Sequence, residues 1–322
     1  MANLRDRGQI ILVAAFALAV IFIALALIVN SAIFTENLAS RGETSGSDGA
    51  LSMRAMVETN AGENLESVNQ QTGVSHGNLE DDMEDSVATI SAQTGTQQAR
   101  GGRLVTVDGP VDRTDGVRIY EDDPQDTLES GAGSSYTVAE DIERLPGANG
   151  TRAFRINVTD MSSTSDTSPL RIRAEDHGAT SDFWEARIWE NGDTVHVETE
   201  RTGGSGPYEC AVTPDNPSQA FEIDVTSGTI DDKPCAALRR VGTGEHLTFS
   251  SGAGDNYDIS LENADLVFGE LSLIAVNPGG TVDVPVLSNQ DALYDVTLEY
   301  EYATSDLRYE TDIRVAPGEP DA

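Results

Sequence analysis

The sequence predicts an α+β protein in which a long N-terminal transmembrane helix and a helical stalk precede a mainly antiparallel, sandwich-like β domain outside the cytoplasm. Three observations predict this class: an uncharged apolar run near the N-terminus, two segments with apolar residues at helical spacing, and short alternating runs after them. These patterns divide the chain into a candidate cleaved leader at 1–8, an anchor helix at 9–41, a stalk at 42–100 and a β-rich domain at 101–322.

The anchor is predicted from the segment Ile10–Val29, which is apolar throughout and carries no charge. Its length matches the roughly 20 residues that a helix needs to cross about 30 Å of hydrocarbon, and it exceeds the usual apolar core of a secretory signal peptide. Arg5 and Arg7 precede the run, whereas the first charge after it is Glu36. The distribution of basic residues therefore predicts a single-pass protein of the cell membrane, with a cytoplasmic N-terminus and an extracellular C-terminal domain.

Small residues share one sector of this predicted helix, because Gly8, Ala15, Ala19 and Ala26 are spaced by 7, 4 and 7 residues. In lipid, small residues let neighbouring helices approach closely, so Ala15, Ala19 and Ala26 are candidate helix-packing residues. The alternative is that alanine is simply common in apolar spans, and the sequence leaves both readings open.

The stretch Arg7-Gly8-Gln9-Ile10, directly before the apolar run, resembles the processing site of archaeal type IV pilins and pilin-like proteins. The resemblance covers about residues 5–40. It implies that a prepilin peptidase cuts after Gly8, that Gln9 becomes the new N-terminus, and that the helix then packs against other pilin-like subunits. Val13 stands where major pilins usually carry glutamate, so a minor or pseudopilin-like component fits the resemblance better.

The stalk is predicted as two amphipathic helices, over Ala50–Gln70 and Asn78–Gln98, in which apolar residues recur at partial three- and four-residue spacing. Asn78 is a suitable N-cap, and the acidic residues that follow it complement the helix N-terminus. We interpret the acidic run Asp81–Asp85 as a solvated helix face rather than a cation site.

The β-rich domain is predicted from alternation of apolar and polar residues, as half-buried strands require. Residues 294–302 and 307–315 form a predicted C-terminal hairpin joined through 303–306. The other expected strands cover residues 154–159, 183–190, 193–199, 221–225, 247–249, 257–261, 271–276 and 281–286. Many short strands without intervening helices indicate an antiparallel sandwich.

The most specific local prediction is a hairpin with Asn191-Gly192 at the centre of a type I′ turn, because that turn needs positive φ at both central residues. This register places Ile188 opposite Val195 and Arg187 opposite His196. His196 is then a surface cross-strand residue rather than a ligand.

Cys210 and Cys235 are the only cysteines, and in an exported domain they are expected to form a disulfide. Two unconnected buried thiols are the alternative, and no nearby histidine completes a zinc site. Asn149 and Asn157 each begin an N-glycosylation motif. Asn149, in a glycine-rich segment, is the better candidate acceptor.

No arrangement of nucleophile, base and orienting group, and no metal-binding motif, is visible in the sequence. The four histidines, His76, His177, His196 and His246, are far apart, and the acidic pairs Asp122-Asp123 and Asp231-Asp232 are expected by coincidence in so acidic a chain. We therefore predict a non-enzymatic protein without a cofactor or a bound metal.

The charge of the chain limits its partners, because 55 acidic and 20 basic residues give a formal net charge of -35. A chain with this charge repels the phosphates of nucleic acid, so we expect no nucleic-acid partner. Lys233 is the only lysine, and this composition resembles that of proteins from halophilic archaea. In about 1 M salt the Debye length falls to about 3 Å, which makes a dense acidic surface tolerable.

These patterns favour a membrane-anchored, pilin-like surface protein with a structural or interaction role in a type IV pilus-like or other cell-surface assembly. Its expected partners are membrane lipid, other pilin-like subunits and a prepilin peptidase. Two alternatives remain: a monomeric anchored binding module for a solute or glycan, and an anchored extracellular hydrolase.

Overall fold

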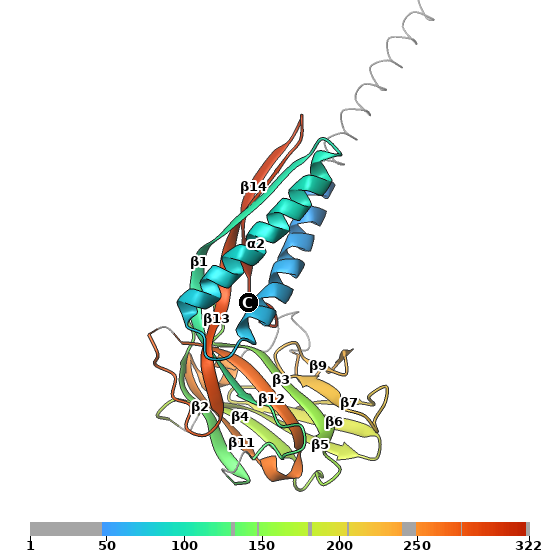
Figure 1. Cartoon of the computed structure of the whole chain (residues 1–322). Helices are drawn as coiled ribbons and strands as arrows, with labels where there is room; N and C mark the ends of the chain where they lie inside the picture. Colours follow the sequence, from blue (N-terminus) through green and yellow to red (C-terminus); the bar gives the residue numbers. More distant parts are fainter. Residues whose placement is uncertain are drawn as a thin grey trace, which may run out of the picture.

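The computed structural model describes residues 47–129, 133–146, 148–179, 182–204, 206–239, 249–277 and 279–319. It shows a β-sandwich joined to an elongated lobe made of two helices and a narrow three-stranded sheet (Figure 1). The first 46 residues lie outside the described part, so Gly8, Gln9, Ala15, Ala19 and Ala26 have no structural account.

The sandwich consists of two antiparallel sheets. One has eight strands in the order β10-β9-β8-β3-β12-β1-β13-β14, and the other has six in the order β2-β11-β4-β5-β6-β7. The strands are β1 (Leu104–Glu121), β2 (Ser135–Glu143), β3 (Thr151–Asp160), β4 (Leu170–Asp176), β5 (Phe183–Asn191), β6 (Thr194–Arg201), β7 (Tyr208–Val212), β8 (Phe221–Asp224), β9 (Thr229–Ile230), β10 (Lys233–Pro234), β11 (Asn256–Glu262), β12 (Phe268–Val276), β13 (Ser288–Ala303) and β14 (Arg308–Val315). A short helix, α3 (Ser250–Ala253), and a 3₁₀ turn (Ala264–Leu266) flank β11.

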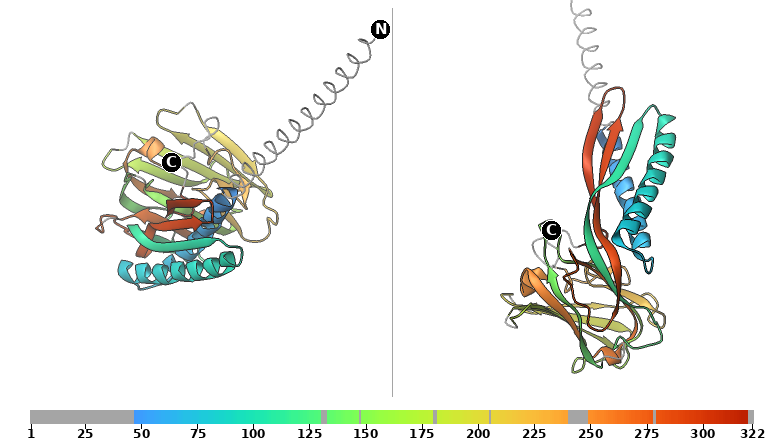
Figure 2. Two further views of the ribbon diagram at one scale, coloured as in Figure 1. Left: turned by 90° about the horizontal axis from the view of Figure 1, so that it is seen from above. Right: turned by 60° about the vertical axis from the view of Figure 1, so that its left-hand side comes forward.

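The strands β1 and β13 belong to both parts of the molecule. One half of each strand lies in the sandwich, and the other half extends beyond it, where β13 lies between β1 and β14 (Figure 2). Their pairing shifts register between Asp108 and Asp112 and again between Thr114 and Asp115. Such bulges bend and twist a strand pair, so one continuous β1–β13 ladder can pack in the sandwich at one end and against the helices at the other.

The helices cover one face of the narrow sheet. The first described helix spans residues 47–69, and α2 spans His76–Ala99. Residues Val57, Ala61 and Leu65 in the first helix, and the series from Leu79 to Ile90 in α2, are buried at three- and four-residue spacing. They form one apolar core with the inward-facing residues of the sheet, Val105, Val107, Leu298, Tyr300, Tyr302, Ile313 and Val315.

The sandwich has its own, larger core between the two sheets. Alternate residues of β3, β4, β5 and β11 point inward, and Trp184 and Phe249 meet edge-on with ring centroids 4.9 Å apart. This core is separate from the core of the elongated lobe, so each part buries apolar side chains of its own.

The predicted fold class is wrong, because the described part is mostly β and contains no stalk built of helices alone. Helices do occur at 47–69 and His76–Ala99, but their apolar faces pack on β1, β13 and β14. The sequence pattern missed β1 altogether, although this 18-residue strand supplies the surface against which α2 packs.

The predicted membrane anchor at 9–41 lies outside the described residues. Among the residues that the structure describes, no helix combines the length and the apolar character that crossing a bilayer requires. The longest of them, α2, has 24 residues but includes the acidic run Asp81–Asp85. The prediction of a single-pass location in the cell membrane is therefore not supported and is withdrawn.

The predicted hairpin at Asn191 exists, but its register is wrong. Asn191 pairs with Thr194, so the two turn residues are Gly192 and Asp193, and Gly192 has a φ of 65°. Each residue of β5 therefore pairs with a β6 residue two positions later than predicted, and every side chain stays on its predicted face of the sheet. His196 therefore lies opposite Trp189 rather than Arg187.

Several other strands differ from prediction. The strands β2, β4 and β7 were not expected, and residues 281–286 form only an isolated bridge through Asp283. The strand expected at 247–249 falls mostly outside the described residues. In β4 the residues Arg171, Arg173 and Glu175 alternate with buried small or branched apolar residues, as in other half-buried strands.

Candidate functional site: the waist and the first helix

The waist, defined here as the junction between the elongated lobe and the sandwich, joins residues far apart in sequence. Asn69, at the end of the first helix, donates from Nδ2 to the Leu293 carbonyl at 2.8 Å and accepts from the Leu293 N–H at Oδ1, also at 2.8 Å. Gln290 Nε2 donates to the Asn69 carbonyl at 2.9 Å. The helix end is thereby fixed to β13.

Arg152 binds the same stretch of β13 as Asn69. Its guanidinium is completely buried and donates to the main-chain carbonyls of Tyr294, Leu293 and Pro317. No carboxylate pairs with it among the described residues, and burial lowers the pKa of Arg152 to about 10. Because three carbonyls from two chain segments meet one side chain, the strand and the C-terminal tail are tied together.

A second helix is tied to the waist by His76. Its Nδ1 lies 3.2 Å from a carboxylate oxygen of Asp291, and its Nε2 lies 2.8 Å from the carbonyl oxygen of Gly116. Both ring nitrogens are thus occupied by structural contacts at the start of α2, which makes His76 part of the junction rather than a free catalytic group.

A cleft of about 470 Å³ lies at the waist, between the end of the first helix and the outer face of the eight-stranded sheet. Arg155 crosses it and pairs with both carboxylate oxygens of Glu66, at 2.8 and 3.2 Å, and with Asp224 at 3.1 Å. Burial alone would lower the pKa of Arg155, but these hydrogen bonds and charges raise it. The cleft therefore contains a structural clamp between helix and sheet.

The first helix also has an exposed strip. Leu51 is 54% and Met56 is 40% exposed, and Ala55 and Thr59 lie beside them on the solvent side. Next to the strip, a groove of about 430 Å³ runs between residues Ala55–Glu66 of this helix and Val315–Pro317. Exposed apolar side chains beside a groove are typical of a protein-contact surface.

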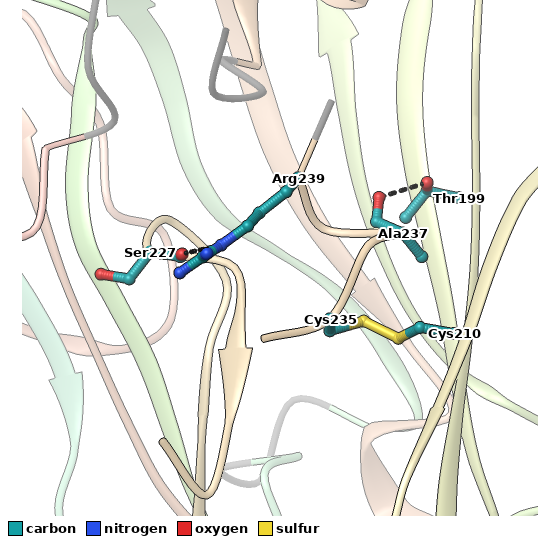
Figure 3. The surroundings of a disulfide bond; sticks show 6 residues. All are labelled: Thr199, Cys210, Ser227, Cys235, Ala237 and Arg239. Atoms are coloured by element: carbon teal, nitrogen blue, oxygen red, sulfur yellow. Dashed lines mark hydrogen bonds between the residues drawn. A yellow bond between two sulfur atoms is a disulfide. The ribbon is translucent and has the colours of Figure 1, made fainter. Parts of the chain in front are cut away.

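The disulfide predicted from sequence is present between Cys210 and Cys235, whose Cα atoms are 5.5 Å apart (Figure 3). Cys210 lies in β7, the edge of the six-stranded sheet, and Cys235 follows β10, the edge of the eight-stranded sheet. The bond therefore joins the two sheets where the sandwich would otherwise open. Beside it, Thr199 donates to the Ala237 carbonyl at 2.7 Å and Arg239 donates to the Ser227 carbonyl at 3.0 Å (Figure 3).

The structure reverses the expected ranking of the two glycosylation candidates by accessibility. Asn149 is only 4% exposed, and its N–H donates to Glu319 at 2.8 Å. Asn157 is half-buried at the cleft, where its amide donates to Glu270 at 3.1 Å. Asn149, the better candidate by sequence, is thus the less accessible of the two in the folded chain.

The three described histidines are separate. His76 lies at the waist, His177 lies 2.7 Å from Asp258 on the six-stranded sheet, and His196 stacks on Trp189. Within the described ranges, no three His, Cys, Asp or Glu side chains gather closely enough to hold a metal ion. His246 lies outside those ranges.

Sequence reasoning missed the residues that organise the waist. No sequence motif marks Asn69, Arg152 or Leu293. The role of the Asn69 carboxamide can be recognised only when the position of β13 beside it is known. The one available signal was the pair of polar residues Asn69 and Gln70 at the end of an apolar helical pattern.

The fold and the waist define a mostly β protein with a helix-backed extension. Residues 4–118 match a family of unknown function, DUF7261. The matched region ends inside β1 and includes both helices of the elongated lobe. No curated protein and no solved structure matches the chain.

Proposed function

We infer that this chain is a pilin-like structural component that acts through protein contacts in a type IV pilus-like or other cell-surface assembly, and that it is not an enzyme. The sequence support is the resemblance of about residues 5–40 to pilin-like proteins. The structural support is the direction in which the chain runs through the elongated lobe.

The observation that carries the proposal is the position of residue 47. The first helix starts near the tip of the β13–β14 hairpin, where Tyr300 donates from its hydroxyl to the Ala50 carbonyl at 3.0 Å. It ends at the waist, where Asn69 binds Leu293. The first helix therefore begins at the pole opposite the sandwich (Figure 1). An N-terminal assembly segment at one pole and a displayed domain at the other is the arrangement that a pilin-like subunit needs.

The contacts at the waist tie the first helix directly to the sandwich. Arg155 clamps the first helix to the sandwich through Glu66, while Asn69 and Arg152 fix β13. A force or displacement applied at the helix is then transmitted to the sandwich rather than absorbed by a linker. The exposed strip at Leu51–Thr59 is the surface on which we place a neighbouring subunit.

The first experiment is mass spectrometry of the protein purified from its native cells. We expect an N-terminus at Gln9, produced by a prepilin peptidase. An N-terminus at Met1 or Ala2 would remove the pilin-like proposal.

The second experiment locates the contact. A photo-crosslinking amino acid at Thr59 should capture a second copy or another pilin-like subunit. The same group at Asp193, on an exposed hairpin of the sandwich, is the matched control. Equal capture from both positions, or capture from Asp193 alone, would contradict the assignment of the strip.

A further inference from the structure

A stacked aromatic pair stands on the outer face of the six-stranded sheet. Trp189 in β5 and His196 in β6 are directly opposite, their ring centroids are 5.4 Å apart and their planes differ by 12°. Both side chains are half-buried, whereas Trp184 on the same strand is in the core. The two stacked rings therefore form an aromatic platform on the outer face of the sheet.

A hollow of about 570 Å³ lies beside this pair. In β7, the residue opposite His196 is Ala211, whose side chain is a single methyl group. The imidazole ring therefore has a bulky neighbour on its Trp189 side and open space on its Ala211 side. A flat ring of ligand size can lie over Ala211 and continue the stack.

The neighbouring row of side chains supplies polar groups. Arg187 Nη1 donates to Glu198 at 2.7 Å, and Arg187 Nη2 donates to the Asp166 carbonyl at 3.0 Å. Glu209, opposite Glu198, is exposed. Arg187 holds Glu198 in place, so carboxylate oxygens stand in fixed positions at the margin of the aromatic platform.

We propose that this face of β5, β6 and β7 binds a neutral carbohydrate. A pyranose ring has an apolar C–H face that packs on an aromatic ring, and its hydroxyl groups donate to carboxylates at the margin. One guanidinium against the carboxylates of Asp166, Glu198 and Glu209 leaves the hollow negatively charged, which excludes acidic sugars. Stacking also survives the high salt that suits so acidic a chain, whereas charge pairing is screened.

The site is independent of the pilin-like proposal, since it uses neither the waist nor the first helix. It adds a ligand-binding surface to the domain that the elongated lobe displays. A binding surface on the distal domain would let an assembled subunit attach to a glycan-coated surface.

The test measures binding of cellohexaose, mannohexaose and a hexamer of N-acetylglucosamine to the full chain by calorimetry, with a hexamer of galacturonic acid as the acidic comparison. We expect saturable binding of at least one neutral hexasaccharide and none of the acidic one. His196→Ala, which removes the ring on which the sugar stacks, should weaken binding by about tenfold or more. The matched control is Phe183→Ala, which removes a half-buried aromatic from the same face of β5, where it packs under Arg173.

A second variant tests the site by filling it rather than by removing an aromatic side chain. Ala211→Phe adds bulk at an exposed edge-strand position and should abolish binding while both tryptophans remain. Circular dichroism and thermal melting establish that each variant is folded. The proposal is overturned if no neutral hexasaccharide binds, or if Phe183→Ala weakens binding as much as His196→Ala. Loss of neutral-hexasaccharide binding in 2 M salt would show that the binding depends on charge rather than on stacking, and would also overturn the proposal.

Discussion

Asn69 and Leu293 form a two-bond pair in which a side-chain carboxamide replaces the backbone of a missing strand. Asn69 Nδ2 and Oδ1 contact the Leu293 carbonyl and N–H, each at 2.8 Å, across 224 positions of sequence. Asn69 is 1% exposed, so water does not compete for these groups. Asn69 therefore accepts a hydrogen bond from the buried N–H of Leu293 at the point where β13 passes from the sandwich into the elongated lobe.

Replacing Asn69 with alanine should destabilise the protein by about 1–3 kcal/mol, because the buried Leu293 N–H then has no acceptor. The measurement is the free energy of unfolding in urea. Asn64→Ala is the matched control, since the side-chain amide of Asn64, on the same helix, donates to the Asn60 carbonyl within its own turn. If the two variants lose equal stability, the pair at the waist has no special role.

Breaking the Cys210–Cys235 bond should cost about 3 kcal/mol in the chain-entropy description, given a separation of 25 residues. Hydrogen exchange should accelerate first in β7 and in residues 229–238, because the bond holds two sheet edges together. The measurement is thermal unfolding with and without a reductant. In a Cys210→Ala/Cys235→Ala variant the reductant should have no effect; a shift there would mean that the reductant acts elsewhere.

The sequence predicted elements with strong periodicity better than elements with mixed pattern. The alternation in residues 294–302 and 307–315 corresponds to β13 and β14, which pair from Val296–Val315 to Ala303–Arg308. By contrast, β1 contains Gly109-Pro110 and a bulge, so its alternation is interrupted and its long ladder with β13 is invisible in sequence.

The hairpin at Asn191 shows why candidate sites were harder to predict than strands. The Asn-Gly signal located the turn, but the chain places Gly192 and Asp193 at its centre. A shift of two residues preserves the faces and exchanges the partners. The Trp189–His196 stack follows from that exchange, and no local residue pattern distinguishes the two registers.

Stability should fall as the pH rises above about 10, where exposed tyrosines of an unfolded chain ionise. Tyr257 is fully buried and donates to the Thr151 hydroxyl at 2.9 Å, and burial raises the pKa of its phenol. A group with a raised folded-state pKa stabilises below its unfolded pKa and loses that contribution as the pH increases. Tyr257→Phe should therefore reduce the slope of unfolding free energy against pH by up to about 1.4 kcal/mol per unit, measured in urea between pH 9 and 11. An unchanged slope would show that Tyr257 ionises equally in both states.

The charge on Asp258 can be tested separately from its hydrogen bonds, because Asp258→Asn keeps an oxygen where Asp258 Oδ1 accepts from the Asp141 N–H at 2.9 Å. The hydrogen bond from His177 Nδ1 to Asp258, at 2.7 Å, and the nearby negative charges raise the pKa of the His177 imidazole. Such a group stabilises the fold below its ordinary pKa near 6.5, and the contribution is lost as the pH rises through the raised folded-state value. Two-dimensional NMR of the histidine ring protons should therefore give a lower pKa for His177 in Asp258→Asn than in the parent chain. Since His177 is solvent-exposed, 2 M salt should narrow the difference between the two proteins. A His177 pKa that is the same in both proteins would assign its shift to the other acidic neighbours, Asp141 and Glu140, rather than to Asp258.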